Sequence, residues 1–186
     1  MVFFKEAKFV DTVNRDIIIR SANGEDAKEV LNFNQEIINT EPYLLTTPDE
    51  FKLTIEQEQE WIENIQQKLN NLILIAMHKG EVVGTLDFHC GHKRRLEHIG
   101  SFGMSVRREY RGSGIGRALL HSLIEWALRN EKIEKINLEV FSNNHRAIEL
   151  YKKIGFVEES LLKNQVKLND NEYIDLIGMG LFLKTL

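Results

Sequence analysis

Residues 111–117 read Arg-Gly-Ser-Gly-Ile-Gly-Arg, and no other stretch of the chain is as informative. A strand-like run, Ile99 to Val106, precedes them, and an apolar helical pattern from Ile115 to Leu128 follows. Such a turn can hold a phosphate, because the first N–H groups of a helix lack intrahelical partners and carry the positive end of its dipole. Glycine also lets the backbone approach an anion closely. The stretch therefore predicts a site for a phosphorylated cofactor, with Arg111 and Arg117 adding positive charge.

Two familiar phosphate-binding motifs do not fit this turn. A P-loop is excluded, because no Gly-Lys-Ser or Gly-Lys-Thr closes it. The dinucleotide fingerprint fits poorly, because Arg117 stands where that motif has a third Gly or Ala, and because much structure is expected before the turn. A glycine-rich loop that simply leads into an amphipathic helix stays open as the purely structural alternative.

A second motif follows the first at a short distance. It consists of Leu138-Glu-Val-Phe-Ser-Asn-Asn144, then Ala147-Ile-Glu-Leu-Tyr151, then Lys153-Ile-Gly-Phe156. Together the two motifs resemble the GNAT superfamily of acyl-CoA N-acyltransferases, in which a strand, Asn, Ala, Leu-Tyr and Gly-Phe recur in this order. The resemblance is closest over residues 99–157 and extends more weakly over residues 16–184.

The resemblance implies the acyl-CoA N-acyltransferase fold, a mixed α/β (α+β) architecture with a central, mostly antiparallel sheet of about seven strands flanked by about four helices. The apolar periodicity gives a matching order, β α α β β β α β α β β. In the family the middle strands diverge after the fourth, and the pantetheine arm enters the gap. We predict a lead-in or extra edge strand over residues 1–15 and a single domain over residues 16–186. We also expect a long strand over Arg95–Val106 and a helix beginning at Thr47-Pro48-Asp49-Glu50.

Composition excludes several classes of protein. The chain has 186 residues, 42% of them hydrophobic and 28% charged, which suits one well-buried domain. A net charge of −4 gives no reason to expect nucleic acid, and no apolar run approaches a membrane span or a signal peptide. The single cysteine, Cys90, excludes an internal disulfide framework and predicts a cytoplasmic location. We predict no metal site, because the spacing of His89, His92 and His98 matches no zinc pattern.

Acyl transfer to an amine needs a base for the amine and an acid for the departing thiolate. The resemblance implies that Tyr151 lies near the cofactor sulfur as the proton donor, although its helical face also suits a purely packing role. Glu139 is the predicted base, because it interrupts a buried strand where desolvation would raise the pKa of its carboxyl group. A solvated edge position for Glu139, a water chain, and Glu97 as the competing carboxylate stay open.

The resemblance also implies which residues bind acetyl-CoA and the acceptor. Main-chain groups of Met104, Ser105 and Val106 should pair with the pantetheine arm, and Asn144 should contact the cofactor while capping its helix. The loop between the first two helices forms a wall of the acceptor pocket in the family, so Glu41 and Tyr43 are predicted to contact the amine. The pyrophosphate is assigned to Arg111, Gly112, Ser113, Gly114, Ile115, Gly116 and Arg117.

The sequence therefore predicts an N-acetyltransferase that moves an acetyl group from acetyl-CoA to a primary amine of a small molecule or peptide. Attack is expected to be direct, in a ternary complex, because Cys90 lies outside both motifs. Two alternatives stay open, a non-catalytic module that binds acyl-CoA and, less well supported, a dinucleotide-binding oxidoreductase. The terminal hairpin could pair two subunits, which predicts a homodimer without nucleic-acid or membrane partners.

Overall fold

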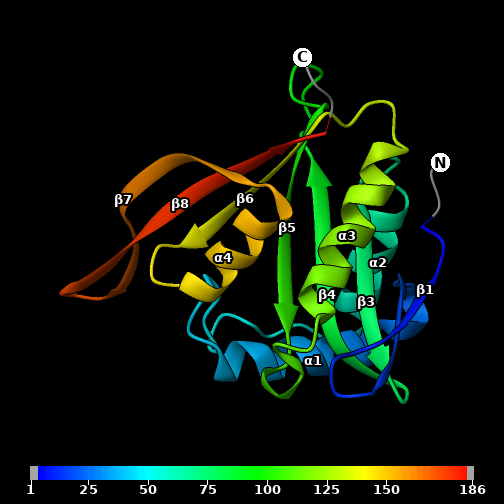
Figure 1. The fold of residues 1–186 in the computed structure, drawn as a ribbon. Helices are drawn as coiled ribbons and strands as arrows, with labels where there is room; N and C mark the ends of the chain where they lie inside the picture. Colours follow the sequence, from blue (N-terminus) through cyan, green and yellow to red (C-terminus); the bar gives the residue numbers. More distant parts are fainter. Residues whose placement is uncertain (1–3, 184–186) are drawn as a thin grey trace.

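One eight-stranded sheet runs through residues 4–183, the part of the chain that the computed structural model describes (Figure 1). The elements are β1 (Ala7–Val10), β2 (Asp16–Ser21), η1 (Gly24–Asp26), α1 (Ala27–Thr40), α2 (Ile55–Gln66), β3 (Leu72–His78), β4 (Glu81–Cys90), β5 (Ile99–Val106), η2 (Arg108–Tyr110), α3 (Ile115–Leu128), β6 (Lys135–Phe141), α4 (His145–Ile154), β7 (Val157–Asn169) and β8 (Glu172–Phe182). The strand order is β1-β2-β3-β4-β5-β6-β8-β7, and only the β5–β6 pair is parallel. The predicted mixed fold is confirmed, with one strand more than expected.

Helices cover both faces of this sheet and bury apolar side chains on each. α3 and α4 pack on one face, where Leu119 and Leu123 are fully buried. α1 and α2 pack on the other face, where Phe33 and Ile62 are fully buried. Burying one side chain of this kind stabilises the fold by about 1.5–3 kcal/mol. The two layers therefore fix the position of the strands that carry the site.

The sheet opens between β5 and β6. These strands pair only where Ile99–Ser101 lies beside Lys135–Asn137, and they diverge beyond that point (Figure 1). The edge of β5 from Phe102 to Val106 consequently has no partner strand on the β6 side, while β4 still pairs with it on the other side. This gap is the one that the family resemblance implies, and the functional site lies in it.

Two predicted element boundaries are wrong. Thr47 and Glu50 do form cap-like hydrogen bonds, in which the Thr47 N–H and hydroxyl groups donate to Glu50 Oε2 (2.9 and 2.8 Å), but they close only a turn. α2 starts at Ile55 instead, because Thr54 and Gln57 form a complete capping box there. The strand expected from Arg95 starts at Ile99, because the preceding residues form a turn in which the Leu96 N–H group donates to the Lys93 carbonyl group (2.7 Å).

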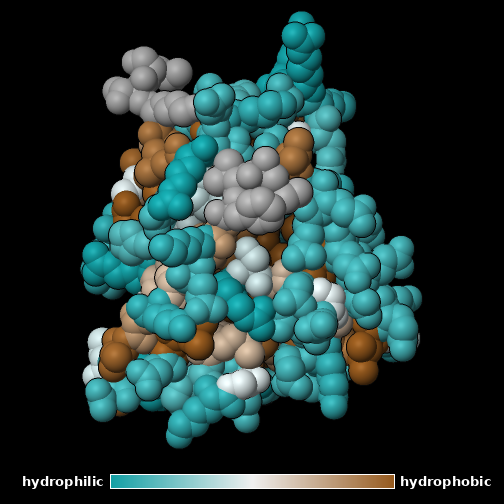
Figure 2. Space-filling model, turned by 90° about the vertical axis from the view of Figure 1, so that its right-hand side faces the viewer, coloured by the Kyte–Doolittle hydropathy of each residue, from teal (hydrophilic) through white to brown (hydrophobic). Residues whose placement is uncertain are grey.

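The β1 edge of the sheet is largely polar. β1 pairs with β2 as an extra edge strand, and the domain boundary at residue 16 stays a prediction. Figure 2 shows this side of the molecule, where hydrophilic residues cover most of the visible surface and hydrophobic residues form small, separate areas. An ion pair between Lys8 and Glu6 (3.1 Å) adds charge here, which discourages pairing with another strand. Within residues 4–183, no helix is long and apolar enough to cross a membrane.

Candidate active site

The glycine-rich turn and the start of α3 line a cleft of about 660 Å³ at the mouth of the β5–β6 gap, which we call the cofactor cleft. Gly112 and Gly114 have φ angles of 79° and 100°, a left-handed conformation that favours glycine. The first hydrogen bond of the helix runs from the Ala118 N–H group to the Gly114 carbonyl group (2.9 Å). The N–H groups of residues 115–117 therefore have no intrahelical acceptor, which is the arrangement that binds a phosphate.

Most residues predicted to bind the cofactor line this cleft. They are Met104, Ser105, Val106, Arg111, Gly112, Gly114, Gly116, Arg117 and Asn144. The side chains of Ser113 and Ile115 do not. Ile115 is fully buried in the core, and the Ser113 hydroxyl group donates to the Tyr110 carbonyl group (2.7 Å). A cofactor contact through the backbone N–H groups of these two residues stays a prediction.

Arg111 is held in place by its neighbours. Its Nε donates to the Val106 carbonyl group (2.9 Å), and its Nη2 lies 2.7 Å from Glu41 Oε2. Glu41 lines the cofactor cleft, and its predicted contact with the amine stays a prediction. The sequence gives no sign of this pairing, because Glu41 ends α1 and Arg111 lies far along the chain. Arg111 thus ties the end of β5 to the end of α1.

Two residues that the sequence analysis missed complete the cofactor cleft. His145 and Arg146 begin α4 and line the cleft opposite the glycine-rich turn. Nη2 of Arg146 would lie 3.5 Å from a Cβ atom added to Gly112, so the guanidinium group reaches the turn. A cation in the first turn of a helix is unfavourable unless an anion binds there. Arg146 at the start of the predicted helix could therefore have indicated an anion site.

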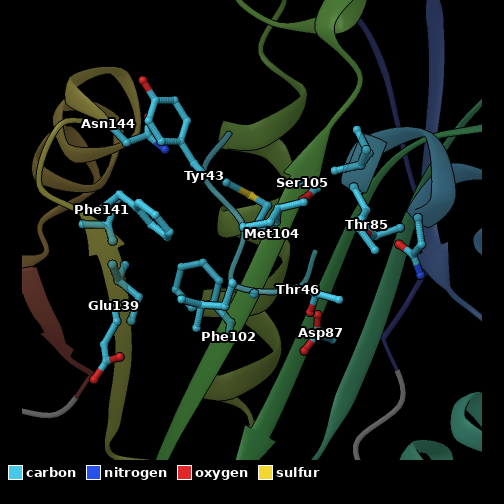
Figure 3. A pocket seen from close by; sticks show the side chains of 18 of the residues that line it. Tyr43, Thr46, Thr85, Asp87, Phe102, Met104, Ser105, Glu139, Phe141 and Asn144 are labelled. Atoms are coloured by element: carbon cyan, nitrogen blue, oxygen red, sulfur yellow. The ribbon is translucent and has the colours of Figure 1, made fainter. Parts of the chain in front are cut away.

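A second cavity of about 420 Å³ adjoins the cofactor cleft, and we call it the acceptor pocket (Figure 3). The two cavities share seven lining residues: Ile37, Tyr43, Leu44, Met104, Ser105, Asn144 and Tyr151. The other apolar walls of the acceptor pocket come from α1, the loop after it, α2, β5, β6 and β8. The residues are Ile38, Leu45, Trp61, Phe102, Leu138, Val140, Phe141 and Leu176. The ring of Tyr43 meets Phe141 edge-on with centroids 6.1 Å apart, and the contact of Tyr43 with the amine stays a prediction. Two molecules bound in the two cavities would meet at Met104 and Tyr151.

Tyr151 is 7% exposed, and its ring packs edge-on against Phe102 and Phe156 with centroids 5.8 and 5.9 Å apart. Burial raises the pKa of its hydroxyl group to about 12. Within residues 4–183 that hydroxyl group makes no hydrogen bond. Tyr151 therefore keeps its proton at neutral pH and holds it at the junction of the two cavities. The packing and the acid interpretations of this residue are both consistent with its position.

The carboxylates predicted for the base lie differently from expectation. Glu139 is exposed, so its expected burial is wrong. On β6, Leu138 and Val140 face the core, and the alternation turns Glu139 toward the opposite face, at the rim of the acceptor pocket. Figure 3 shows its carboxylate turned away from Met104. Glu97 lies in the loop before β5, 3.7 Å from Lys132, and lines none of the cavities described here.

Asp87 is a carboxylate in the acceptor pocket that the sequence analysis overlooked. It is half-buried on β4, beside Gly103 of β5, and its Oδ2 lies 3.0 Å from His89 Nε2. Figure 3 shows it on the β4 side of the pocket, opposite Glu139. The alternation of polar and apolar residues along β4 indicates which face Asp87 occupies, but not which strand lies beside it. Within residues 4–183, no group of three or more His, Cys, Asp or Glu residues could hold a metal ion.

Comparison with known proteins identifies the chain. Residues 35–156 match the Acetyltransferase (GNAT) family. The chain belongs to this family. L-amino acid N-acetyltransferase AaaT from Escherichia coli (strain K12) is 28% identical over 165 residues, which cover 89% of this chain and 97% of that protein. An N-alpha-acetyltransferase from Sulfurisphaera tokodaii is 25% identical over 179 residues, which cover 92% and 96%.

Solved structures of similar proteins have the same fold. An acetyltransferase of the GNAT family from Streptococcus pneumoniae has a TM-score of 0.83 and 28% identity, covering 89% of this chain and 98% of that one. The Salmonella typhimurium protein yncA, solved with its cofactor acetyl-CoA, has a TM-score of 0.80 and 20% identity, covering 91% and 95%. At that identity the likeness to yncA shows the fold alone.

The GNAT assignment gives the reaction class of the enzyme. This enzyme is an N-acetyltransferase, and acetyl-CoA is its co-substrate. The cofactor cleft suits that molecule, because it combines a helix N-terminus shaped by glycines with the guanidinium groups of Arg117 and Arg146. The edge of β5 that has no partner strand on the β6 side lies beside this cleft.

Proposed function

We propose that the enzyme transfers the acetyl group of acetyl-CoA directly to a primary amine while both substrates are bound. The observation that carries this proposal is the position of Tyr151, which lines the cofactor cleft and the acceptor pocket at once. In the transfer, the amine nitrogen attacks the thioester carbonyl carbon, a C–N bond forms and the C–S bond breaks. Tyr151 donates its proton to the departing thiolate, and Glu139 accepts the proton that the amine releases. The products are an N-acetylated amine and CoA.

Binding of the nucleotide end rests on the turn before α3. We propose that the pyrophosphate lies against the backbone of Gly112 to Arg117, with Arg117 and Arg146 beside it. Arg111 positions the turn through Glu41 and Val106. The pantetheine arm then follows the β5 edge from Val106 to Met104 and brings the thioester to Tyr151, with Asn144 at its side.

Gly114→Ala is expected to weaken CoA binding about tenfold, while Gly80→Ala leaves it unchanged. Gly114 and Gly80 both have positive φ angles (100° and 86°), and an added Cβ meets nothing within 4 Å at either position. Each substitution therefore strains the backbone by about 1–2 kcal/mol, but only Gly114 lies in the phosphate turn. Calorimetric titration with CoA, together with thermal unfolding, separates the two effects. Equal affinity in the two variants would refute the proposed pyrophosphate site.

The direct route predicts that Cys90→Ser keeps its turnover. Cys90 ends β4, lines none of the cavities described here, and is buried, which raises the pKa of its thiol group to about 11. Such a thiol is a poor nucleophile, because only the thiolate attacks. The measurement is kcat with the best acceptor, with circular dichroism as the control for folding. A folded Cys90→Ser protein without activity would require an acetyl-cysteine intermediate and would overturn direct transfer.

Release of CoA from acetyl-CoA in the presence of a panel of amines tests the function itself. The panel should include free amino acids, peptides and simple amines, since the relatives are named for L-amino acid and N-alpha acetylation. A titration with CoA runs alongside. Amine-dependent release supports the proposal, whereas tight CoA binding without release on any amine would favour a non-catalytic binding module.

We further propose that the enzyme is cytoplasmic and forms a homodimer through the β7–β8 hairpin. The single cysteine suits a reducing compartment. The hairpin projects from the body of the sheet (Figure 1), and it exposes about half of the surface of Leu161, Leu168 and Tyr173. β7 is also an edge strand with unpaired backbone groups. A monomer in sedimentation equilibrium at micromolar concentration would overturn the dimer.

A further inference from the structure

A third cavity, of about 510 Å³, continues the acceptor pocket along β6, and we call it the side pocket. Phe102, Leu138 and Glu139 line both cavities, so a ligand that enters one can extend into the other. The walls of the side pocket are polar, unlike those of the acceptor pocket. Its polar side chains are Ser101, Asn137, Glu139, Glu159 and Ser160.

Negative charge without a matching cation characterises the joined cavities. Within residues 4–183, no lysine or arginine lines either of them. Asp87 pairs only with His89, and Glu139 forms no ion pair with the described residues. Lys135 lies beside the side pocket, but its Nζ is held 2.6 Å from Glu159 Oε2 and 4.9 Å from the centre of the Phe182 ring.

This charge pattern discriminates between kinds of amine. A free amino acid carries a carboxylate on the carbon next to its amine, and that group would enter a pocket holding Asp87 and Glu139 with no cation to pair with. Placing like charges together at a binding site costs several kcal/mol, or about 100-fold or more in affinity. An amine without that carboxylate escapes the penalty.

The side pocket also holds an unused hydrogen-bond acceptor. Asn137 Oδ1 is buried and makes no hydrogen bond within residues 4–183. Leaving a buried polar atom without a partner is unfavourable, so a ligand N–H group placed there would gain binding free energy. The neighbouring hydroxyl groups of Ser101 and Ser160 suit the same kind of ligand.

From these observations we infer that the acceptor is the N-terminal amine of a peptide. The apolar walls of the acceptor pocket receive its first side chain, and the side pocket receives the following peptide group, whose N–H donates to Asn137 Oδ1. This inference rests on the proposed function for the transfer step, but it concerns recognition and can be tested apart from it.

The test compares four acceptors at saturating acetyl-CoA: L-leucine, L-leucinamide, L-leucyl-L-alaninamide and isopentylamine. The amine of the dipeptide amide is less basic than that of leucine, which could by itself raise its reactivity. Isopentylamine controls for this effect, because it lacks a carboxylate but is at least as basic as leucine. We expect kcat/KM for the dipeptide amide to exceed that for leucine at least about 100-fold. We also expect Asn137→Ala to lower the ratio of kcat/KM for the dipeptide amide to that for isopentylamine about tenfold. The exposed Asn64→Ala on α2 is the matched control, and it should leave this ratio unchanged.

Each outcome decides one question. Leucine used as well as the dipeptide amide overturns the inference and leaves the acetyltransferase function intact. Isopentylamine used as well as the dipeptide amide overturns the role of the side pocket. If no acceptor releases CoA, the proposed transfer fails, and calorimetric binding to the CoA-saturated enzyme tests recognition by itself. Binding of the dipeptide amide but not of leucine would then support the inference, and equal or absent binding would refute it.

Discussion

Tyr151→Phe is expected to lower kcat by about 10²- to 10⁴-fold with little change in the KM for acetyl-CoA. The substitution removes only the hydroxyl group, so the ring contacts with Phe102 and Phe156 remain and the melting temperature should stay nearly the same. The loss falls on kcat because the proton is needed when the thiolate departs and not when acetyl-CoA binds.

The pH profile gives this prediction a second test. The acid must be protonated to act, and a pKa near 12 keeps Tyr151 protonated across the working range. Deprotonation of Tyr151 can therefore lower the rate of the wild-type enzyme only as the pH rises toward 12. Tyr110→Phe is the matched control, since Tyr110 also lines the cofactor cleft but not the acceptor pocket. Equal losses of kcat and of CoA affinity in Tyr151→Phe would indicate that the residue only packs.

Most of the fold could be predicted from the sequence, because its strands and helices have clear apolar periodicity. The glycine-rich turn at residues 111–117 and the Asn144–Tyr151 segment were placed correctly, since special backbone angles and capping leave local signals. The start of α2 was misplaced, because two overlapping capping signals occur seven residues apart, at Thr47 and Thr54. Only packing determines which one begins the helix.

Less of the site could be predicted from the sequence, because the site depends on which strands become neighbours. Asp87 reaches the acceptor pocket only because β4 pairs with β5, and Glu41 meets Arg111 only because α1 ends beside the turn after β5. Neither relation leaves a mark in local sequence. For Glu139 the apolar neighbours suggested burial, but Leu138 and Val140 face the core and Glu139 points to the opposite face of β6, where it is exposed.

Glu139→Gln is expected to lower kcat/KM for the amine by about 100-fold at neutral pH. Gln keeps the size of the side chain but cannot take a proton from the attacking amine. Asp87→Asn should instead act mainly on KM, because Asp87 lies in the acceptor pocket and attracts the incoming ammonium group. Both variants are nearly isosteric, and the two residues lie on opposite sides of the pocket, so each serves as the control for the other (Figure 3).

The pH dependence distinguishes a lost base from a lost contact. As the pH rises, more of the amine is already free of its proton, so the deficit of Glu139→Gln should shrink if Glu139 is the base. If Glu139 instead only contacts the cationic amine, Glu139→Gln should raise KM. That increase should grow at low pH, where more of the amine is in its ammonium form. If Asp87→Asn shows the larger loss of kcat and the loss is relieved at high pH, the base is Asp87. Glu139 would then only contribute negative charge at the rim where the acceptor pocket meets the side pocket.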